Sequence, residues 1–509
     1  MRHRRAAVCA VLACVVPWAA ACHRGDAAPA RGDQPGATTA TAAPTTVPAA
    51  PVPGAGPSPE EVALEREFPL HGFVTGLQLK VRTAADPEAR VLGWLRMGSR
   101  VRLAPNPTKT PTCRSGWYRL RPQGFACAGE GIEVSEHANE SAVAVNPPAK
   151  DAALPYSYYY VKEPKVPEYH RLPSRDDQRE ARDFLARYAE LVAKNQERGD
   201  AFLRGEVPGE PRPLLIRNFL ERAFFFAGAG VEERASRQFV RGVRGSYVKL
   251  QQLEPRRGSD FHGVELGGEV KLPVAWTIRD AMPFSVKPKD VPPPQGGGGF
   301  RRGAVSSDLR LVTDEGSQPI ARHVVVPWSG RKRIGDALFH ALADGRYLKS
   351  WFLAVAEKIE RPKEIGADEP WVHVNLEQQT LVAYRGDEPV YATLVSSGLQ
   401  EHASPTGLFE IRAKYVADTM SDLGPEAGDD RYKIEDVPWT EYFSGSLALH
   451  GAFWHDRFGL PRSHGCINLA PLDAHRLFNH TWPVVPEGWH GVTTDGTGLR
   501  GSKVLITEK

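Results

Sequence analysis

From residue 370 onward the sequence is divided into short segments in which apolar and polar residues alternate. The first of these is Trp371–Leu376, and similar runs follow at residues 379–384, 390–395, 408–413 and 503–507. A period of two over a few residues is typical of strands that bury one face. Pro471 and Asp473 suit the first turn of a short helix through Phe478, because proline is tolerated there and an acid favours the N-terminal dipole. Residues 370–509 are therefore predicted to form a compact β-rich domain.

A histidine and a lone cysteine in this region are each flanked by glycine and are separated by fifteen residues. His450 ends a short apolar run that begins at Ser446, and Cys466 lies in the string Ser463-His464-Gly465-Cys466-Ile467-Asn468. The thiolate is the reactive form of cysteine, and a free thiol with a pKa of about 8.5 is only a few per cent ionised at pH 7. A histidine within hydrogen-bond reach takes this proton and returns it to a leaving amine. The pattern thus indicates a nucleophilic cysteine with a histidine base.

We expect His450 to be the base, because the end of a strand holds its ring in a fixed frame, and we expect His464 to shape the site. Gly465 lets a backbone N–H approach a reacting carbonyl and, with the N–H of Cys466, form an oxyanion hole. The other candidates are Ser463 as a supporting residue, Gly451 as the residue that leaves room for the base and orients its ring through the carbonyl oxygen, and Asn468 as a holder of a substrate carboxylate or amide.

These strings resemble the signature of the YkuD-type L,D-transpeptidases. Two earlier segments, Ser397-Gly398 and Ser404-Pro405-Thr406-Gly407-Leu408-Phe409, also resemble that family, so the likeness covers about residues 371–507. The resemblance implies a β-sandwich with the cysteine beside a tunnel, in which Cys466 is the nucleophile and His450 the acid/base. It also implies a loop over the tunnel at residues 454–459, with Trp454 packed on a substrate stem peptide or on the sheet.

The resemblance further implies a peptidoglycan L,D-transpeptidase without a cofactor. Cys466 would attack the amide after the third residue of a tetrapeptide stem, expel the terminal D-alanine and hold a thioester. A side-chain amine of another stem then resolves the thioester and forms a 3→3 cross-link, or another amine acceptor is attached. A peptidoglycan hydrolase or L,D-carboxypeptidase on the same fold is the main alternative, because water can replace the amine at the same residues.

Three other interpretations are weaker. A zinc site of His450, His464 and Cys466 would hold a single sulfur, whereas structural zinc usually takes four ligands with paired cysteines or histidines. A papain-like peptidase places its cysteine before its histidine, and the order here is reversed. A non-catalytic wall-binding protein would have a decayed site, yet each chemical group is present. No metal is expected, and the remaining histidines of the region are interpreted as surface or strand residues, namely His373, His402, His455, His475, His480 and His490.

The start of the chain indicates export. A basic start precedes an apolar run that is broken by Pro17 and is shorter than the roughly 20 residues of a membrane span, so residues 1–22 are predicted to be a signal peptide. Ala19-Ala20-Ala21-Cys22 resembles a bacterial lipobox, in which Cys22 is lipidated, and cleavage at an Ala-x-Ala site is the alternative. Residues 23–66, rich in Ala, Pro and Thr, are predicted to be a disordered linker. The predicted location is the periplasm, with a lipid anchor to the membrane.

Residues 67–136 are predicted to form a small β barrel. Leu79 and Val81 alternate with polar residues, and the strings Gly93-Trp94-Leu95 and Gly116-Trp117-Tyr118 resemble those of bacterial SH3-like domains, which are often appended to cell-wall enzymes. Cys113 and Cys127 lie close in sequence, and exported proteins meet oxidising conditions, so these two residues are predicted to form a disulfide.

Residues 150–365 are predicted to be a mixed α/β region, and their sequence names no reaction. Ser174 and Asp177 are placed to cap a helix whose apolar face recurs through Val192, and residues 214–226 are predicted to be another helix. The arginines between residues 234 and 244 are interpreted as a solvated face. The 64 basic and 61 acidic residues leave a net charge of +3, which is too balanced to indicate nucleic-acid binding. The predicted fold class is thus mainly β with an α/β middle region, and the predicted partners are peptidoglycan stem peptides.

Overall fold

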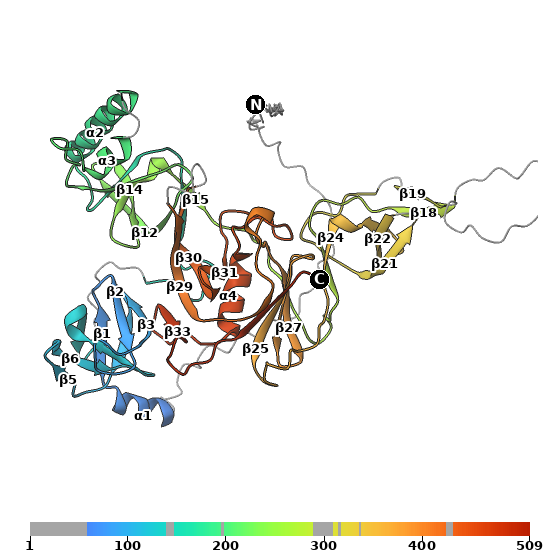
Figure 1. Cartoon of the computed structure of the whole chain (residues 1–509), viewed down its shortest axis with the longest axis horizontal. Helices are drawn as coiled ribbons and strands as arrows, with labels where there is room; N and C mark the ends of the chain where they lie inside the picture. Colours follow the sequence, from blue (N-terminus) through green and yellow to red (C-terminus); the bar gives the residue numbers. More distant parts are fainter. Residues whose placement is uncertain are drawn as a thin grey trace, which may run out of the picture. The chain divides into compact units, whose positions relative to one another are not determined.

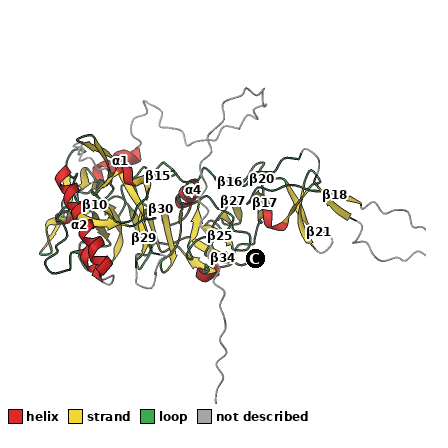
Figure 2. Cartoon of the chain, turned by 90° about the horizontal axis from the view of Figure 1, so that it is seen from above, coloured by secondary structure: helices red, strands yellow, loops and turns green. Residues whose placement is uncertain are grey.

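The computed structural model describes residues 59–138, 147–194, 198–288, 309–313, 317–334, 337–423 and 431–509. Strands make up most of the regular structure of these residues, as the mainly β prediction requires (Figure 2). The predicted signal peptide with Cys22 lies outside the described residues, as does most of the predicted linker. None of the described helices has the length and apolar character that a membrane-spanning helix needs.

The last part of the predicted linker is helical. Helix α1 spans Pro59–Glu67 and so overlaps the end of the segment 23–66 that was predicted to be disordered. Here the composition changes from Ala, Pro and Thr to Glu, Leu and Val, and a proline stands at the first helical position, where its missing N–H costs nothing. The prediction of disorder is therefore wrong for these residues.

The N-terminal region of the structure is a small β domain (Figure 1, blue). Its strands are β1 (Leu70–Val74), β2 (Gln78–Arg82), β3 (Val91–Arg96), β4 (Arg100–Leu103), β5 (Thr108–Thr110), β6 (Cys113–Arg119), β7 (Phe125–Cys127) and β8 (Ile132–Ser135). A disulfide between Cys113 and Cys127 joins the start of β6 to the end of β7. The core of the domain includes Leu95 and also the distant Trp489, which is 1% exposed, so the C-terminal region completes this core.

The middle region contains one β module twice, and residues 225–256 of the first copy correspond to residues 325–356 of the second with an offset of 100. The first module (residues 157–256) holds β9 (Ser157–Val161), β10 (Val166–Tyr169), α2 (Arg175–Lys194), α3 (Gly199–Arg204), β11 (Ile216–Leu220), β12 (Phe225–Arg234), β13 (Arg237–Gly242), β14 (Tyr247–Lys249) and β15 (Leu253–Arg256). The second module (residues 274–356) holds β17 (Val274–Thr277), β18 (Ser285–Pro288), β19 (Leu309–Val312), β20 (Val325–Val326), β21 (Trp328–Ile334), β22 (Ala337–Leu342), β23 (Tyr347–Lys349) and β24 (Leu353–Ala356).

The strand register shows that the two modules correspond residue by residue. Phe239 pairs with Lys249 in the first module, and Phe339 pairs with Lys349 in the second. Phe225 pairs with Tyr160, just as Val325 pairs with Trp276. Between the equivalent strands, the first module inserts α2 and α3, whereas the second inserts the β18–β19 hairpin. The sequence analysis did not detect this repeat.

Two predictions for the first module have different outcomes. The capped helix is present as α2, where the Asp177 N–H donates to Ser174 Oγ over 3.1 Å and the Ser174 N–H donates to an Asp177 carboxylate oxygen over 2.7 Å. The helix predicted at residues 214–226 is wrong, because this segment forms β11 and the start of β12. Its aromatic and β-branched residues fit a pleated surface that is buried against β9 and β10.

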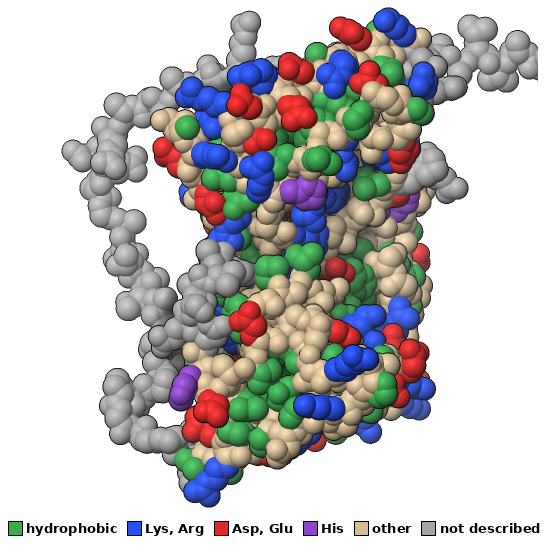
Figure 3. Space-filling model, turned by 90° about the vertical axis from the view of Figure 1, so that its left-hand side faces the viewer, with side chains coloured by type: hydrophobic (Ala, Val, Ile, Leu, Met, Phe, Trp, Pro, Cys, Tyr) green, Lys and Arg blue, Asp and Glu red, His purple; other side chains and the backbone are tan. Residues whose placement is uncertain are grey.

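The arginines between residues 234 and 244 lie on two strands and a turn: the exposed Arg234 ends β12, Arg237 and Arg241 are half-buried on β13, and Arg244 is in the turn that follows. Arg237 donates to the Ser174 carbonyl oxygen, Arg241 pairs with Glu232 over 2.8 Å, and Arg244 reaches Asp436 of the C-terminal region over 3.5 Å. On the face drawn in Figure 3, basic and acidic side chains are interspersed.

The C-terminal region is built from two sheets and one helix. The first sheet has the order β16-β27-β26-β25-β34-β28, with bounds Val264–Glu265, Glu388–Leu394, Thr380–Arg385, Pro370–Asn375, Lys503–Thr507 and Gly407–Glu410. The other strands are β29 (Ala413–Asp422), β30 (Tyr432–Ser444), β31 (Leu447–Gly451), β32 (Ile467–Leu469) and β33 (Gly491–Thr493), and the helix is α4 (Pro471–His480). Apolar side chains of both sheets and of α4 form one core that includes Val372, Leu449 and Leu477.

Candidate active site

Two parallel strands bring the predicted histidine and cysteine into one cavity. Strand β31 pairs with β32, with His450 opposite Asn468 and Leu449 opposite Ile467, so that Cys466 enters β32 beside the strand that carries His450. Leu449 and Ile467 are fully buried, which fixes both strands in the core. Cys466 is a free cysteine, and both Cys466 and His450 line a cavity of about 650 Å³.

We call this space the cysteine cavity. Four further parts of the chain contribute to its wall, namely β12, the turn at residues 400–402, the β29–β30 hairpin and the loop after β31. Its lining residues are Phe225, His402, Thr419, Met420, Ser421, Asp422, Tyr432, Ile434, Tyr442, Ser446, Leu447, His450, Trp454, Arg462, Ser463, His464, Cys466 and Asn468.

The turn before Cys466 is held by a chain of hydrogen bonds. Gly465 has a φ of +109°, a left-handed conformation that favours glycine. Its N–H donates to Ser463 Oγ over 3.1 Å, and Ser463 Oγ donates to the Cys466 carbonyl oxygen over 2.5 Å. Ser404 donates to the Gly465 carbonyl oxygen over 2.8 Å and accepts from the Gly398 N–H over 3.0 Å. The Gly465 N–H, which was predicted to face a reacting carbonyl, is thus engaged by Ser463.

The electrostatics of the site favour an uncharged thiol and an uncharged imidazole. Burial lowers the pKa of His450 to about 4, although its contact with the Gly451 carbonyl opposes this shift. Burial also raises the pKa of the Cys466 thiol, against a backbone hydrogen bond from Ala448. His450 Nδ1 lies 3.3 Å from the Gly451 oxygen, and a carbonyl only accepts, so Nδ1 carries the proton. Nε2 is therefore the basic nitrogen.

His464 lies differently from His450. Its side chain is exposed, and its ring stacks on Tyr432 with centroids 5.5 Å apart and an interplanar angle of 26°. The ring of His402 lies 4.8 Å from that of His464. His464 therefore belongs to the rim of the cysteine cavity, whereas His450 is 2% exposed.

Asn468 is fixed by a histidine whose role the sequence analysis missed. His455 was interpreted as a surface or strand residue, but it is half-buried, and burial lowers its pKa to about 3. Its Nδ1 accepts from the Arg457 N–H over 3.3 Å, and its Nε2 lies 3.0 Å from the Asn468 side-chain amide. A neutral imidazole has a single acceptor nitrogen, so Nε2 carries the proton and donates to the Asn468 side chain, which is thereby held in place. The ring of Trp454 lies 5.7 Å from that of His450.

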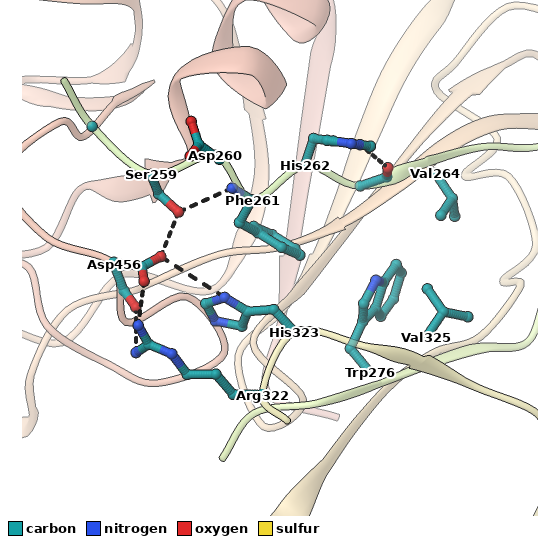
Figure 4. A pocket seen from close by; sticks show the side chains of 12 residues that line it. Ser259, Asp260, Phe261, His262, Val264, Trp276, Arg322, His323, Val325 and Asp456 are labelled. Carbon is teal, nitrogen blue, oxygen red and sulfur yellow. Dashed lines mark hydrogen bonds and ion pairs between the residues drawn. The ribbon is translucent and has the colours of Figure 1, made fainter. Parts of the chain in front are cut away.

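A second cavity of about 620 Å³ lies on the other side of the loop after β31, the loop that carries Trp454 (Figure 4). Asp456 accepts hydrogen bonds from Ser259 and Arg322, and His323 stands 3.8 Å from its carboxylate. Phe261, Trp276 and Val325 also line this cavity. Within the described residues, no group of three or more histidines, cysteines and acids is placed to hold a metal ion.

Residues 369–505 match the model of the YkuD family, the L,D-transpeptidase catalytic domain. An L,D-transpeptidase mutant from Enterococcus faecium is 21% identical over 27% of this chain and 50% of its own, with a TM-score of 0.22. The catalytic domain of the E. faecium enzyme is 22% identical over 28% of this chain and 98% of its own (TM-score 0.20), and an L,D-transpeptidase from Mycobacterium smegmatis is 17% identical over 36% and 77% (TM-score 0.23). The chain spans half the length of the first of these relatives. The comparison with curated proteins gives no match.

Proposed function

We propose that this chain is an exported peptidoglycan L,D-transpeptidase with Cys466 as its nucleophile and His450 as its general base. The observation that carries the proposal is the shared cavity of Cys466 and the buried, uncharged His450 within residues that match the YkuD domain. Export and lipidation of Cys22 belong to the proposal through the signal-like start of the sequence.

In the first half-reaction, Cys466 Sγ attacks the carbonyl carbon of the third residue of a tetrapeptide stem. The thiol proton passes to His450 Nε2 as the carbon–sulfur bond forms, so neither group needs to be charged beforehand. The imidazolium then returns this proton to the amine of the departing D-alanine as the amide bond breaks. The products are a thioester on Cys466 and free D-alanine.

In the second half-reaction, a side-chain amine of another stem attacks the thioester. His450 accepts a proton from the attacking amine and returns it to the sulfur as the carbon–sulfur bond breaks, which gives a 3→3 cross-link and restores the thiol. Ser463 and Gly465 hold the turn that orients the sulfur. Asn468, Trp454 and His464 border the substrate. Water as the acceptor would use the same groups and give a tripeptide.

The test is to incubate the chain with purified disaccharide-tetrapeptides and to weigh the products by mass spectrometry. We expect dimers that have lost one D-alanine, and we expect no such product from Cys466→Ala. Tripeptide as the sole product would show carboxypeptidase activity in place of transpeptidation. Absence of both products from a folded chain would contradict the proposal.

A further inference from the structure

The first module reaches the cysteine cavity from outside the residues that match the family model. Strand β12 pairs in parallel with β30, with Phe225 opposite Ile434, and both residues line the cavity. The ring of Phe225 lies 6.2 Å from that of Trp454 and 5.5 Å from that of Phe453. Phe225 and Trp454 therefore form an aromatic pair in the same cavity as Cys466.

The position of Phe225 is fixed by packing on both sides. Its ring lies 5.5 Å from Tyr160 in an edge arrangement, and the neighbouring Tyr158 stacks on Phe453 with centroids 4.0 Å apart. Tyr158 is 1% exposed and donates to the Asp436 carbonyl oxygen over 2.6 Å. A ring held in this way is pre-organised, so little conformational entropy is lost when a ligand packs on it.

The first module also supports the neighbouring wall of the cavity, which is formed by the β29–β30 hairpin. Arg244 donates to Thr419 Oγ1 over 2.7 Å, and the Ala227 N–H donates to Glu435 over 3.4 Å. Both partners belong to the β29–β30 hairpin, and this hairpin supplies Tyr432 and Met420 to the cavity. The module thus contributes a lining residue and also holds the hairpin that forms another wall.

The second module provides an internal comparison. Val325 occupies the position of Phe225 in the repeat, but it lines the second cavity, on the far side of the loop. Figure 4 shows Val325 beside Trp276 there, with Asp456 tied to Arg322. The shared fold therefore does not by itself place this position of the repeat in the cysteine cavity. Of the two equivalent residues, only Phe225 lines that cavity, and only Phe225 is aromatic.

We propose that Phe225 is a substrate-contacting residue that selects the side chain of the third stem residue of the acyl donor. This inference rests on the proposed function, because the reacting carbonyl at Cys466 belongs to that residue. A side chain with a methylene chain and a terminal ammonium gains apolar contact along its chain and cation–π attraction over the faces of Phe225 and Trp454. The first module is then part of the active site.

The test compares two tetrapeptide donors that differ only at the third residue, which is either lysine or alanine. We expect the unmodified chain to prefer the lysine donor, and we expect Phe225→Ala to raise the KM for that donor by about tenfold while the alanine donor changes much less. Phe225→Leu keeps apolar contact but removes the aromatic face, so an intermediate KM is expected. Val325→Ala is the matched control from the second module and should leave both KM values unchanged.

Equal changes for both donors, or no change with Phe225→Ala and Phe225→Leu, would overturn the inference. Melting temperatures of the variants show whether a variant has a folding defect. If Phe225→Ala has one, the KM values of the conservative variant Phe225→Leu for the two donors decide. Failure of the unmodified chain to release D-alanine from either donor contradicts the proposed function itself, so the two failures are distinguishable.

Discussion

The two modules of the middle region share one fold and one strand register, yet they meet the C-terminal region in physically different ways. The first module meets it through an apolar core that includes Tyr158 and Ile434, and through Arg244, which reaches the buried carboxylate of Asp436 over 3.5 Å. Asp436 is also paired with Arg96 of the N-terminal β domain. The second module meets the C-terminal region through an apolar core in which Trp276 and Ala354 pack with Val382, and through a half-exposed pair of Arg322 and Asp456. The difference shows that two copies of a module can share apolar cores with the same region and yet add ion pairs of very different burial.

This contrast assigns different roles to the two cavities. The first module borders the cavity that holds Cys466, while the second borders a cavity without a cysteine or His450 in its lining. The loop from Ala452 to Gly459 lies between them, with Trp454 on one side and Asp456 on the other. We therefore expect changes at the first junction to affect both stability and reaction, and changes at the second to affect mainly the loop.

The largest effect is expected in the cysteine cavity. His450→Ala removes the proposed proton acceptor of Cys466, so the rate of acylation should fall by about 10²- to 10⁴-fold. In the unmodified chain the rate should fall with acid only as the pH approaches the pKa of His450, about 4, because the neutral imidazole is the active form. Single-turnover release of D-alanine between pH 4 and 8 measures both the rate of the variant and the pH dependence of the unmodified chain. A near-normal rate in the variant would transfer the base role to another group.

The next largest effect is expected at the buried Asp436, which pairs with Arg96 of the N-terminal β domain and with Arg244 of the first module. Burial alone acts to raise the pKa of Asp436, but the Arg96 guanidinium outweighs it and holds that pKa below its usual value. Asp436→Asn would leave Arg96 buried without its counter-charge, which typically costs about 3–5 kcal/mol of unfolding free energy. Urea unfolding measures this loss. A change below about 1 kcal/mol would show that the buried Asp436 pair contributes little to stability.

Acid should weaken the second module more than the first. Burial, aided by Arg331, lowers the pKa of His340 to about 4, and the neutral ring accepts a hydrogen bond from Trp328 over 2.9 Å. The unfolded histidine has a pKa of about 6.5, so the unfolded state binds more protons between pH 6.5 and 4. The stabilisation is complete above pH 6.5 and falls with acid, by about 3 kcal/mol at pH 4. Hydrogen exchange at pH 7 and pH 5 should show earlier opening of residues 337–356, and equal opening of the first module would contradict this difference.

The smallest effect is expected at the exposed junction. Asp456→Asn removes the ion pair with Arg322, and because both side chains are more than 40% exposed the unfolding free energy should change by about 1 kcal/mol or less. High salt should reduce the difference between the variant and the unmodified chain further, since exposed charges are screened. Urea unfolding in low and high salt measures this. A loss as large as that of Asp436→Asn would show that burial does not distinguish the two ion pairs.

The strands and the helix around the motif were predictable because each has a local signal. Trp371–Leu376 alternates in polarity and forms most of β25, and Pro471 opens α4 as expected. The long hairpin of β29 and β30 carries no such signal, because its charged residues are buried in pairs. Lys414, which is fully buried, donates to the Phe478 and Thr481 carbonyl oxygens, and a sequence pattern cannot reveal partners so distant along the chain.

The candidate site shows the same division. Cys466 and His450 were predicted from their glycine-flanked motif, whereas Phe225 reaches the cavity from more than 200 residues away. The contact of His455 with Asn468 likewise depends on how the loop after β31 returns to β32. The repeat of the middle region is visible in residues such as Tyr247 and Tyr347, but few side chains are identical, and the equivalence becomes plain only in the strand register.

The most direct test of the account is to find the covalent intermediate. The chain is mixed with a disaccharide-tetrapeptide, quenched in acid, digested and analysed by mass spectrometry. We predict a disaccharide-tripeptide adduct on the peptide that contains Cys466, strongly reduced in His450→Ala and absent in Cys466→Ala. An adduct on another residue, or turnover without any adduct at Cys466, would contradict the account.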